Sequence, residues 1–196
     1  GLAGKRLFLQ LDGAAHIATV YVNGVEAATH RCGYTAFRVE VTKLVEPGRS
    51  NLLAVKLDTS ENPSIPPFGF VVDYLTYGGL YREAWLDVRE NGYITDIYVT
   101  TPTLTTANVK VATDGAPDGA KLEVSILDSA GKTVWAGAAG KANVPDAKPW
   151  DTARPDLYRC EARLLAPEGM ELDRQEAAFG FRTAQFKADG FYLNGK

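Results

Sequence analysis

The chain has 196 residues, with 21 Lys and Arg against 24 Asp and Glu, which gives a formal net charge of −3. Hydrophobic residues make up 45% and charged residues 23%, and these values exclude a disordered chain, a collagen, a coiled coil and a cysteine-stapled miniprotein. The slight negative charge and the lack of a basic run argue against nucleic acid as a partner. No apolar run reaches the roughly 18 residues of a spanning helix, so no membrane partner is expected.

Hydrophobic residues in the first half of the chain alternate with polar ones, which predicts strands. Leu7, Leu9 and Leu11 begin the series. Further runs of the same kind occupy residues 17–22, 37–41, 53–57 and 84–88. Asn23-Gly24 follows the run at residues 17–22, and this dipeptide supplies the two positive φ angles of a type I′ hairpin turn. The first half is therefore predicted to be a β-sandwich.

The second half repeats this pattern with different spacing. Short alternating segments lie within 94–101, 109–111, 122–126, 134–135, 158–164 and 179–181, and we expect about seven short strands in all. That number in fewer than about 100 residues is typical of an immunoglobulin-like sandwich, although the Cys…Trp…Cys signature of antibody domains is missing. No segment keeps a helical period over a dozen residues, so the whole chain is predicted to be all-β.

The polar turn at Glu90-Asn91-Gly92 predicts a domain boundary, with a first domain over 1–90 and a second over 91–184. Residues 191–193 read as a strand, and Asn194-Gly195 is a strong hairpin signal. No partner for this strand is apparent, so we expect 185–196 to begin a further domain of a longer protein. Cys32 and Cys160 fall in different domains and are expected to be free, buried or half-buried, and not metal ligands.

Several of these segments together resemble glycoside hydrolase family 2, which includes β-galactosidases, β-glucuronidases and β-mannosidases. The segments that carry the resemblance are, in chain order, Ala18–Gly24 (ATVYVNG), Gly33–Phe37 (GYTAF), Asp73–Arg82 (DYLTYGGLYR), Trp150 with Pro155–Tyr158 (PDLY), Phe179–Arg182 (FGFR) and Phe191–Gly195 (FYLNG). Cys32 departs from the family pattern, in which a glycine is usual at this position. Each motif alone is weak, but their order and spacing together are specific.

The resemblance implies a jelly-roll, galactose-binding-like sandwich that lacks its first strands, followed by an immunoglobulin-like sandwich. A TIM-barrel catalytic domain of the same polypeptide would follow in the complete enzyme and would carry both catalytic glutamates. Retaining glycosidases need two carboxylates about 5–5.5 Å apart. No glutamate of this chain matches either role, so we expect no catalytic residue, no metal site, no cofactor and no turnover here.

Asp73 is the one substrate-binding residue that the resemblance implies. In related enzymes this aspartate contacts hydroxyls of the terminal sugar and, in some galactosidases, a sodium ion. A carboxylate suits that role because it can accept hydrogen bonds from two hydroxyls. The alternative is a loop carboxylate that caps a turn or pairs with an arginine.

The neighbours of Asp73 have structural interpretations. Gly78-Gly79 is expected to serve backbone geometry rather than phosphate binding, and Arg82 to form an ion pair. The aromatic side chains nearby could stack on sugars, but packing in a core or between domains is the commoner outcome. These residues are Phe68, Phe70, Tyr74, Tyr77 and Tyr81.

We therefore predict the non-catalytic front portion of a retaining exo-β-glycosidase, a β-galactosidase in the first instance, whose carbohydrate substrate binds the complete enzyme. Two alternatives remain: a stand-alone carbohydrate-binding module, and a purely structural tandem of sandwiches. The usual habitat of related enzymes favours a periplasmic or secreted location, with a cytoplasmic one left open. A homo-oligomer is also left open, because a truncated jelly roll exposes strand edges.

Overall fold

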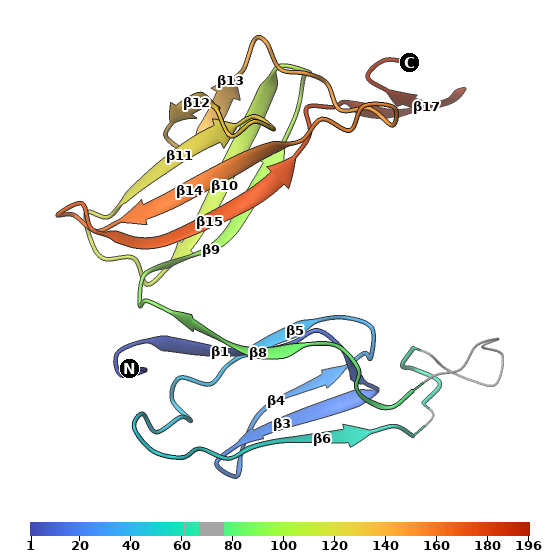
Figure 1. Ribbon diagram of the computed structural model, residues 1–196. Coiled ribbons are helices and arrows are strands. Elements are labelled where there is room, and N and C mark those ends of the chain that lie inside the picture. The colour runs from blue at the N-terminus through green and yellow to red at the C-terminus, as the bar shows by residue number, and fades with distance from the viewer. Residues whose placement is uncertain (61, 67–76) are drawn as a thin grey trace. The chain divides into compact units, whose positions relative to one another are not determined.

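A computed structural model describes residues 1–60, 62–66 and 77–196, and these residues form strands, turns and loops without an α-helix. The prediction of an all-β chain is thus confirmed. The chain divides into two compact units, Gly1–Arg89 and Glu90–Lys196 (Figure 1). Among the described residues there is no helix with the length and hydrophobicity needed to cross a membrane.

The described residues of the first unit form two three-stranded antiparallel sheets, in the orders β5-β1-β8 and β4-β3-β6, and a small pair β2-β7. Its strands are β1 (Arg6–Leu11), β2 (Ala14–Ala15), β3 (Ile17–Val22), β4 (Val25–Arg31), β5 (Phe37–Glu40), β6 (Leu53–Asp58), β7 (Gly79–Leu80) and β8 (Ala84–Arg89). Figure 1 shows β1, β5 and β8 in one layer and β3, β4 and β6 in the other. The alternating runs of the sequence therefore become the two layers of a β-sandwich.

The core of this unit lies between the two layers because each central strand turns its apolar side inward. Leu7 and Leu11 of β1 are 1% exposed, and they share one hydrophobic cluster with Ala18 and Val20 of β3. Phe8 points to the opposite side of β1, where the Arg38 guanidinium covers its ring at 3.8 Å from the centroid. One face of this sheet thus faces the core, and the other carries charged side chains.

The turn between β3 and β4 has the predicted backbone conformation, with φ of 51° at Asn23 and 83° at Gly24. The Asn23 side chain also fixes the neighbouring loop. Its Nδ2 donates to the Leu44 carbonyl and to Asn51 Oδ1, both at 2.8 Å, and its Oδ1 accepts from the Leu52 N–H at 2.9 Å. One residue therefore makes the hairpin and ties it to the chain entering β6.

The second unit forms a sandwich of seven strands, in sheets of order β13-β10-β9 and β12-β11-β14-β15. Its strands are β9 (Tyr93–Thr100), β10 (Thr106–Asp114), β11 (Lys121–Leu127), β12 (Thr133–Gly137), β13 (Gly140–Asn143), β14 (Tyr158–Leu165) and β15 (Glu171–Phe179). The sequence analysis expected about seven strands and placed six of them. The sequence analysis missed β13, whose short GKAN segment has one buried side chain, Ala142.

Aromatic packing closes one end of this core. Phe181 is fully buried, and its ring meets those of Tyr158 and Phe179 edge-on, with centroids 4.9 and 5.2 Å away. Cys160 is also fully buried, and burial raises the pKa of its thiol to about 11. Cys32 is half-buried, and both cysteines are free, as the sequence predicts.

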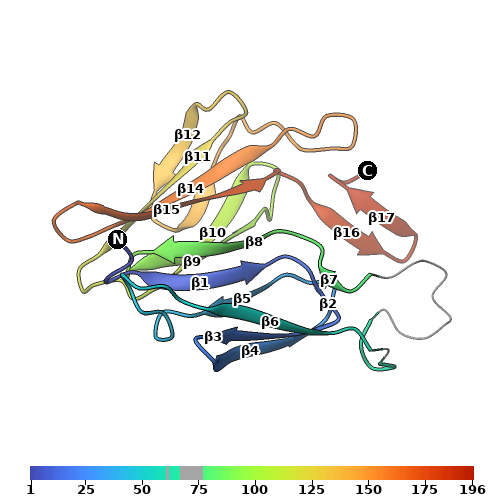
Figure 2. The same cartoon turned by 60° about the horizontal axis from the view of Figure 1, so that its bottom comes forward.

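The C-terminal segment corrects one expectation. The strand predicted at residues 191–193 has a partner, since β17 (Gly190–Leu193) pairs with β16 (Ala184–Lys187) just upstream. Figure 2 shows these two strands side by side. The partner escaped sequence analysis because all four residues of β16 are exposed, so burial imposes no alternation on them. Asn194 and Gly195 do adopt the predicted positive φ angles, 54° and 81°.

Candidate functional site

Asp73, the substrate-binding residue implied by the sequence, lies outside the described residues, as do Phe68, Phe70 and Tyr74. The structure does describe the end of the same motif, from Tyr77 to Arg82. The candidate site is therefore built from the contacts that hold this end of the motif in place.

The two glycines of the motif serve backbone geometry, as predicted. Gly79 has a φ of 119°, which disfavours residues with a side chain. At Gly78, a Cβ would lie 2.2 Å from Cγ2 of Thr59, so a larger residue would have to displace that side chain. Strand β7 begins at the second glycine and pairs with β2, with Gly79 opposite Ala15 and Leu80 opposite Ala14.

Tyr81 and Arg82 anchor the motif to two other loops. The Tyr81 hydroxyl donates to the Gly33 carbonyl, and Nη1 of Arg82 donates to the carbonyls of Tyr34 at 3.0 Å and Asp12 at 3.3 Å. The ion pair predicted for Arg82 is not among its contacts with the described residues. A guanidinium suits this task because its several N–H groups can join two carbonyls from different loops.

Gly13 makes room for both anchoring side chains. A Cβ at this position would lie 2.9 Å from Cδ of Arg82 and 3.0 Å from Cζ of Tyr81. The Gly13 carbonyl also accepts from the Tyr81 N–H at 3.3 Å. The motif end, the loop before β2 and the GYTAF segment therefore meet at one end of the first unit.

Aromatic side chains at this end are exposed rather than part of the core. The exposed fraction is 70% for Tyr77, 42% for Tyr81 and 39% for Tyr34. The sequence analysis favoured packing for Tyr77 and Tyr81, and core packing is wrong for both. Tyrosine rings can lie against the C–H faces of a sugar while the hydroxyl hydrogen-bonds, so this end has the chemistry of a carbohydrate contact.

The GYTAF segment begins beside a small polar cluster. His30 Nε2 and the Thr35 hydroxyl are 2.8 Å apart, and the His30 ring stacks on Phe37 with centroids 4.5 Å apart. Hydrogen bonds to Cys32, the strongest from the Thr35 side chain, lower the pKa of its thiol. These contacts fix the loop that supplies the Gly33 and Tyr34 carbonyls to Tyr81 and Arg82.

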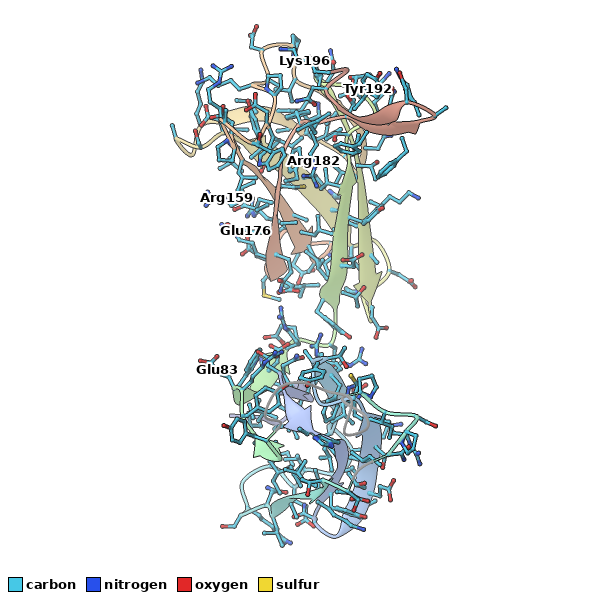
Figure 3. All side chains as sticks on the ribbon, turned by 90° about the vertical axis from the view of Figure 1, so that its right-hand side faces the viewer. Glu83, Arg159, Glu176, Arg182, Tyr192 and Lys196 are labelled. Atoms are coloured by element: carbon cyan, nitrogen blue, oxygen red, sulfur yellow. The ribbon has the colours of Figure 1, made fainter. Side chains whose placement is uncertain are left out.

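In the second unit, three motif segments that are distant in sequence come together. The Asn194 side chain donates to the Trp150 carbonyl at 2.9 Å and accepts from the Thr183 N–H at 3.0 Å. The Arg182 guanidinium lies 4.8 Å from the Trp150 ring centroid. Figure 3 shows Arg182, Tyr192 and Lys196 at the end of the unit that carries the hairpin. The W, FGFR and FYLNG motifs therefore form one junction between the sandwich and its hairpin.

A surface hollow that the sequence did not predict lies between the loop at Asp128–Lys132 and residues 144–148, with a volume of about 490 Å³. Its polar groups mostly bond within their own loops. The Asp128 carboxylate accepts from the Ala130 and Lys132 N–H groups, and the Tyr158 hydroxyl accepts from the Lys148 N–H. Among the residues with described positions, no group of three His, Cys, Asp or Glu could hold a metal ion.

The fold and the motif contacts place the chain in a structural class: it consists of two β-sandwich units followed by a C-terminal hairpin. Residues 92–182 match the family described as Glycosyl hydrolases family 2. The chain is 30% identical to a β-galactosidase of Thermoanaerobacter pseudethanolicus over 98% of its own length, and it spans 28% of that protein. It is 29% identical to a β-glucuronidase of Paenibacillus borealis, covering 99% of this chain and 36% of the relative.

Solved structures agree with these relatives. The β-glucuronidase of Bifidobacterium dentium, complexed with coumarin-3-O-glucuronide, superposes with a TM-score of 0.89 at 28% identity. That match covers 100% of this chain and 39% of the structure. The chain belongs to glycosyl hydrolase family 2, and it spans about a third of the length of the relatives that it matches.

Proposed function

We propose that these residues are the non-catalytic front portion of a retaining exo-β-glycosidase that acts on terminal β-galactosides. The observation that carries the proposal is the match over nearly the whole chain to a β-galactosidase of which it spans 28%. A β-glucuronidase matches almost as well, so β-glucuronides are the competing substrates. The two sugars differ at C6, where a glucuronide carries a carboxylate in place of a hydroxymethyl group, and in the configuration of the hydroxyl at C4.

The pKa values of the described carboxyl groups favour a non-catalytic role for this chain. A general acid of a glycosidase needs a carboxyl with a raised pKa. Among the described carboxyls with a shifted pKa, every shift is downward. Hydrogen bonds from Arg174 and Arg163 hold the pKa of Glu171 at about 2, and hydrogen bonds lower those of Glu40, Asp58 and Asp151. Such carboxylates stabilise arginines and turns.

Within this proposal, Asp73 accepts hydrogen bonds from hydroxyls of the terminal sugar. Its motif ends at Tyr81 and Arg82, whose bonds to the Gly33, Tyr34 and Asp12 carbonyls fix the described end of the motif. Fixing one end of a segment reduces the conformational entropy lost when a residue of that segment binds its ligand. The catalytic carboxylates would come from a TIM-barrel domain of the same polypeptide.

Hydrolysis of nitrophenyl glycosides tests both the choice of substrate and the non-catalytic role of the 196-residue chain. The full-length protein should hydrolyse nitrophenyl β-D-galactoside faster than nitrophenyl β-D-glucuronide, and the 196-residue chain should hydrolyse neither. A preference for the glucuronide would reassign the substrate. Turnover by the chain alone would contradict its non-catalytic role.

A second candidate is sugar binding by the chain itself. The exposed Tyr34, Tyr77 and Tyr81 at one end of the first unit favour it. Titration calorimetry of the 196-residue chain with galactose, and with glucuronic acid as a second ligand, distinguishes this candidate from a role that needs the complete enzyme. Heat of binding that is lost in Tyr77→Ala would support it.

A further inference from the structure

Three Asn-Gly dipeptides occur in the chain, and their asparagines are Asn23, Asn91 and Asn194. An Asn-Gly pair can modify itself, because the backbone nitrogen of the glycine can attack the side-chain carbon Cγ of the asparagine. Glycine has no Cβ, so its nitrogen is less shielded than that of any other residue. The three dipeptides are alike in sequence, and the folded structure therefore determines which of them reacts.

Hydrogen bonds hold the side-chain amide of Asn23. Its Nδ2 donates to the Leu44 carbonyl and to Asn51 Oδ1, and its Oδ1 accepts from the Leu52 N–H. These bonds must break before Cγ can approach the Gly24 nitrogen. The φ of 51° also places Asn23 in the left-handed region, where ψ is about +47°, whereas the five-membered ring of the reaction needs a negative ψ.

Asn194 is held in the same way. Its Nδ2 donates to the Trp150 carbonyl at 2.9 Å, and its Oδ1 accepts from the Thr183 N–H at 3.0 Å. The Asn194 N–H donates to the Thr183 carbonyl at 2.8 Å, and φ is again left-handed, at 54°. Ring closure at Asn194 would therefore break the junction between the second sandwich and its hairpin.

Asn91 has neither restraint. Its side chain is exposed and makes no hydrogen bond with any residue that the structure describes. Asn91 is also absent from the described residues that have a positive φ. The glycine that follows is needed for packing, since a Cβ on Gly92 would lie 3.1 Å from the Gly115 carbonyl oxygen and from Cα of Ala116. The fold thus requires the glycine but leaves the amide of the asparagine free to move.

We propose that Asn91 is a site of spontaneous deamidation. The Gly92 nitrogen bonds to Cγ of Asn91, the bond from Cγ to Nδ2 breaks, and Nδ2 leaves as ammonia with the proton of the Gly92 N–H. One water molecule then opens the succinimide ring. Attack of water on Cγ gives aspartate, and attack on the backbone carbonyl carbon gives isoaspartate. The net reaction exchanges an amide and water for a carboxylic acid and ammonia.

The modification falls in the segment that joins β8 to β9. β8 ends at Arg89 and β9 begins at Tyr93, so Asn91 lies midway between them. In isoaspartate the backbone runs through the side chain, which adds one carbon atom to the main chain of this short connection. Both products also add a negative charge beside Glu90. The protein should therefore change with age at this connection, while the two hairpin turns keep their asparagines.

Ageing of the full-length protein at mildly alkaline pH tests the proposal. Trypsin places the three asparagines in separate peptides, residues 7–31, 90–110 and 188–196. Mass spectrometry then measures, for each peptide, the fraction in which an amide has become an acid. We expect Asn91 to react at least about tenfold faster than Asn23 and Asn194, because the latter two react only after local opening. In urea-unfolded protein the three rates should become similar.

A rate at Asn91 no higher than those at Asn23 and Asn194 in the folded protein would overturn the proposal. A difference that persists in urea would place the cause in the local sequence and would also overturn it. Asn91→Gln keeps an exposed amide but cannot form the five-membered ring, so peptide 90–110 of this variant should keep its mass. Conversion that continues in the variant would assign the reaction to Asn108 and contradict the proposal. Hydrolysis of glycosides is not measured, so the result does not depend on the substrate.

Discussion

The two sandwich units differ in how their edges close. In the second unit, β9 packs against β15 at one edge and β12 against β13 at the other. In the first, β5 contacts β4 at one edge, but at the other edge, formed by β6 and β8, core-facing leucines are exposed. Ile94 on edge strand β9 is 4% exposed, whereas Leu86 on edge strand β8 is 43% exposed. The alternating sequence pattern of a strand sets the face to which each side chain points. Whether that side chain is buried depends on whether the facing sheet extends far enough to cover it.

The largest expected effect comes from the closed core. Phe181→Ala in the second unit should lower the free energy of unfolding by about 3–5 kcal/mol, because a fully buried ring leaves a cavity. Urea denaturation of the chain measures the change. Phe186→Ala on the hairpin, where the ring is 87% exposed, is the control and should change stability little. Equal losses in both variants would mean that the hairpin is covered in solution.

Two residues opposite each other on β1 and β8 test the same difference within the first unit. Leu9→Ala should cost about 2–5 kcal/mol, whereas Leu86→Ala, directly opposite, should cost about 1 kcal/mol in this chain, since Leu86 already contacts water. The measurement is again urea denaturation of the 196-residue chain. A Leu86→Ala loss as large as that of Leu9→Ala would show that Leu86 is covered in solution.

The two units should also differ in how a substitution in each affects catalysis. Asp73→Ala in the full-length protein should lower kcat/KM by about tenfold to a hundredfold, the loss expected for a charged hydrogen bond worth about 1.5–3 kcal/mol. Asp96→Ala, which removes an exposed aspartate of the second unit, is the control and should leave kcat/KM unchanged. Steady-state kinetics on nitrophenyl β-D-galactoside provide the readout. Matching kinetics in the two variants would remove Asp73 from the site.

The smallest effect is electrostatic and belongs to the second unit. Arg174 and Arg163 lower the pKa of Glu171 from its usual 4.5 to about 2. Because the folded-state pKa is the lower one, this carboxylate stabilises the fold above pH 4.5, and the contribution is lost as the pH falls toward 2. Glu171→Gln should therefore lower the melting temperature slightly at pH 7 and not at pH 2. Thermal melts at both values test this, and an undiminished difference at pH 2 would contradict it.

Sequence patterns predicted most of the strands, because the alternation of apolar and polar residues and the Asn-Gly turns depend only on neighbouring residues. β1, β3 and β11 match alternating runs, and Asn23 has the positive φ that its turn requires. The missed elements are those in which burial imposes little pattern: β13 buries one side chain, and β16 none. Of the candidate site, the sequence indicated Arg82, but its carbonyl partners come from loops about 50 and 70 residues away.

By itself, the sequence determined the all-β class, the family and the direction in which most side chains point, because alternation and turn dihedrals depend on neighbouring residues. Only the tertiary structure decided which of the core-facing leucines are covered. It also decided that β17 pairs with β16, and that Tyr81 and Arg82 fasten the Asp73 motif to Gly33, Tyr34 and Asp12. Burial and backbone hydrogen bonds are made between distant segments, and the local pattern of one strand does not specify which segment will meet it.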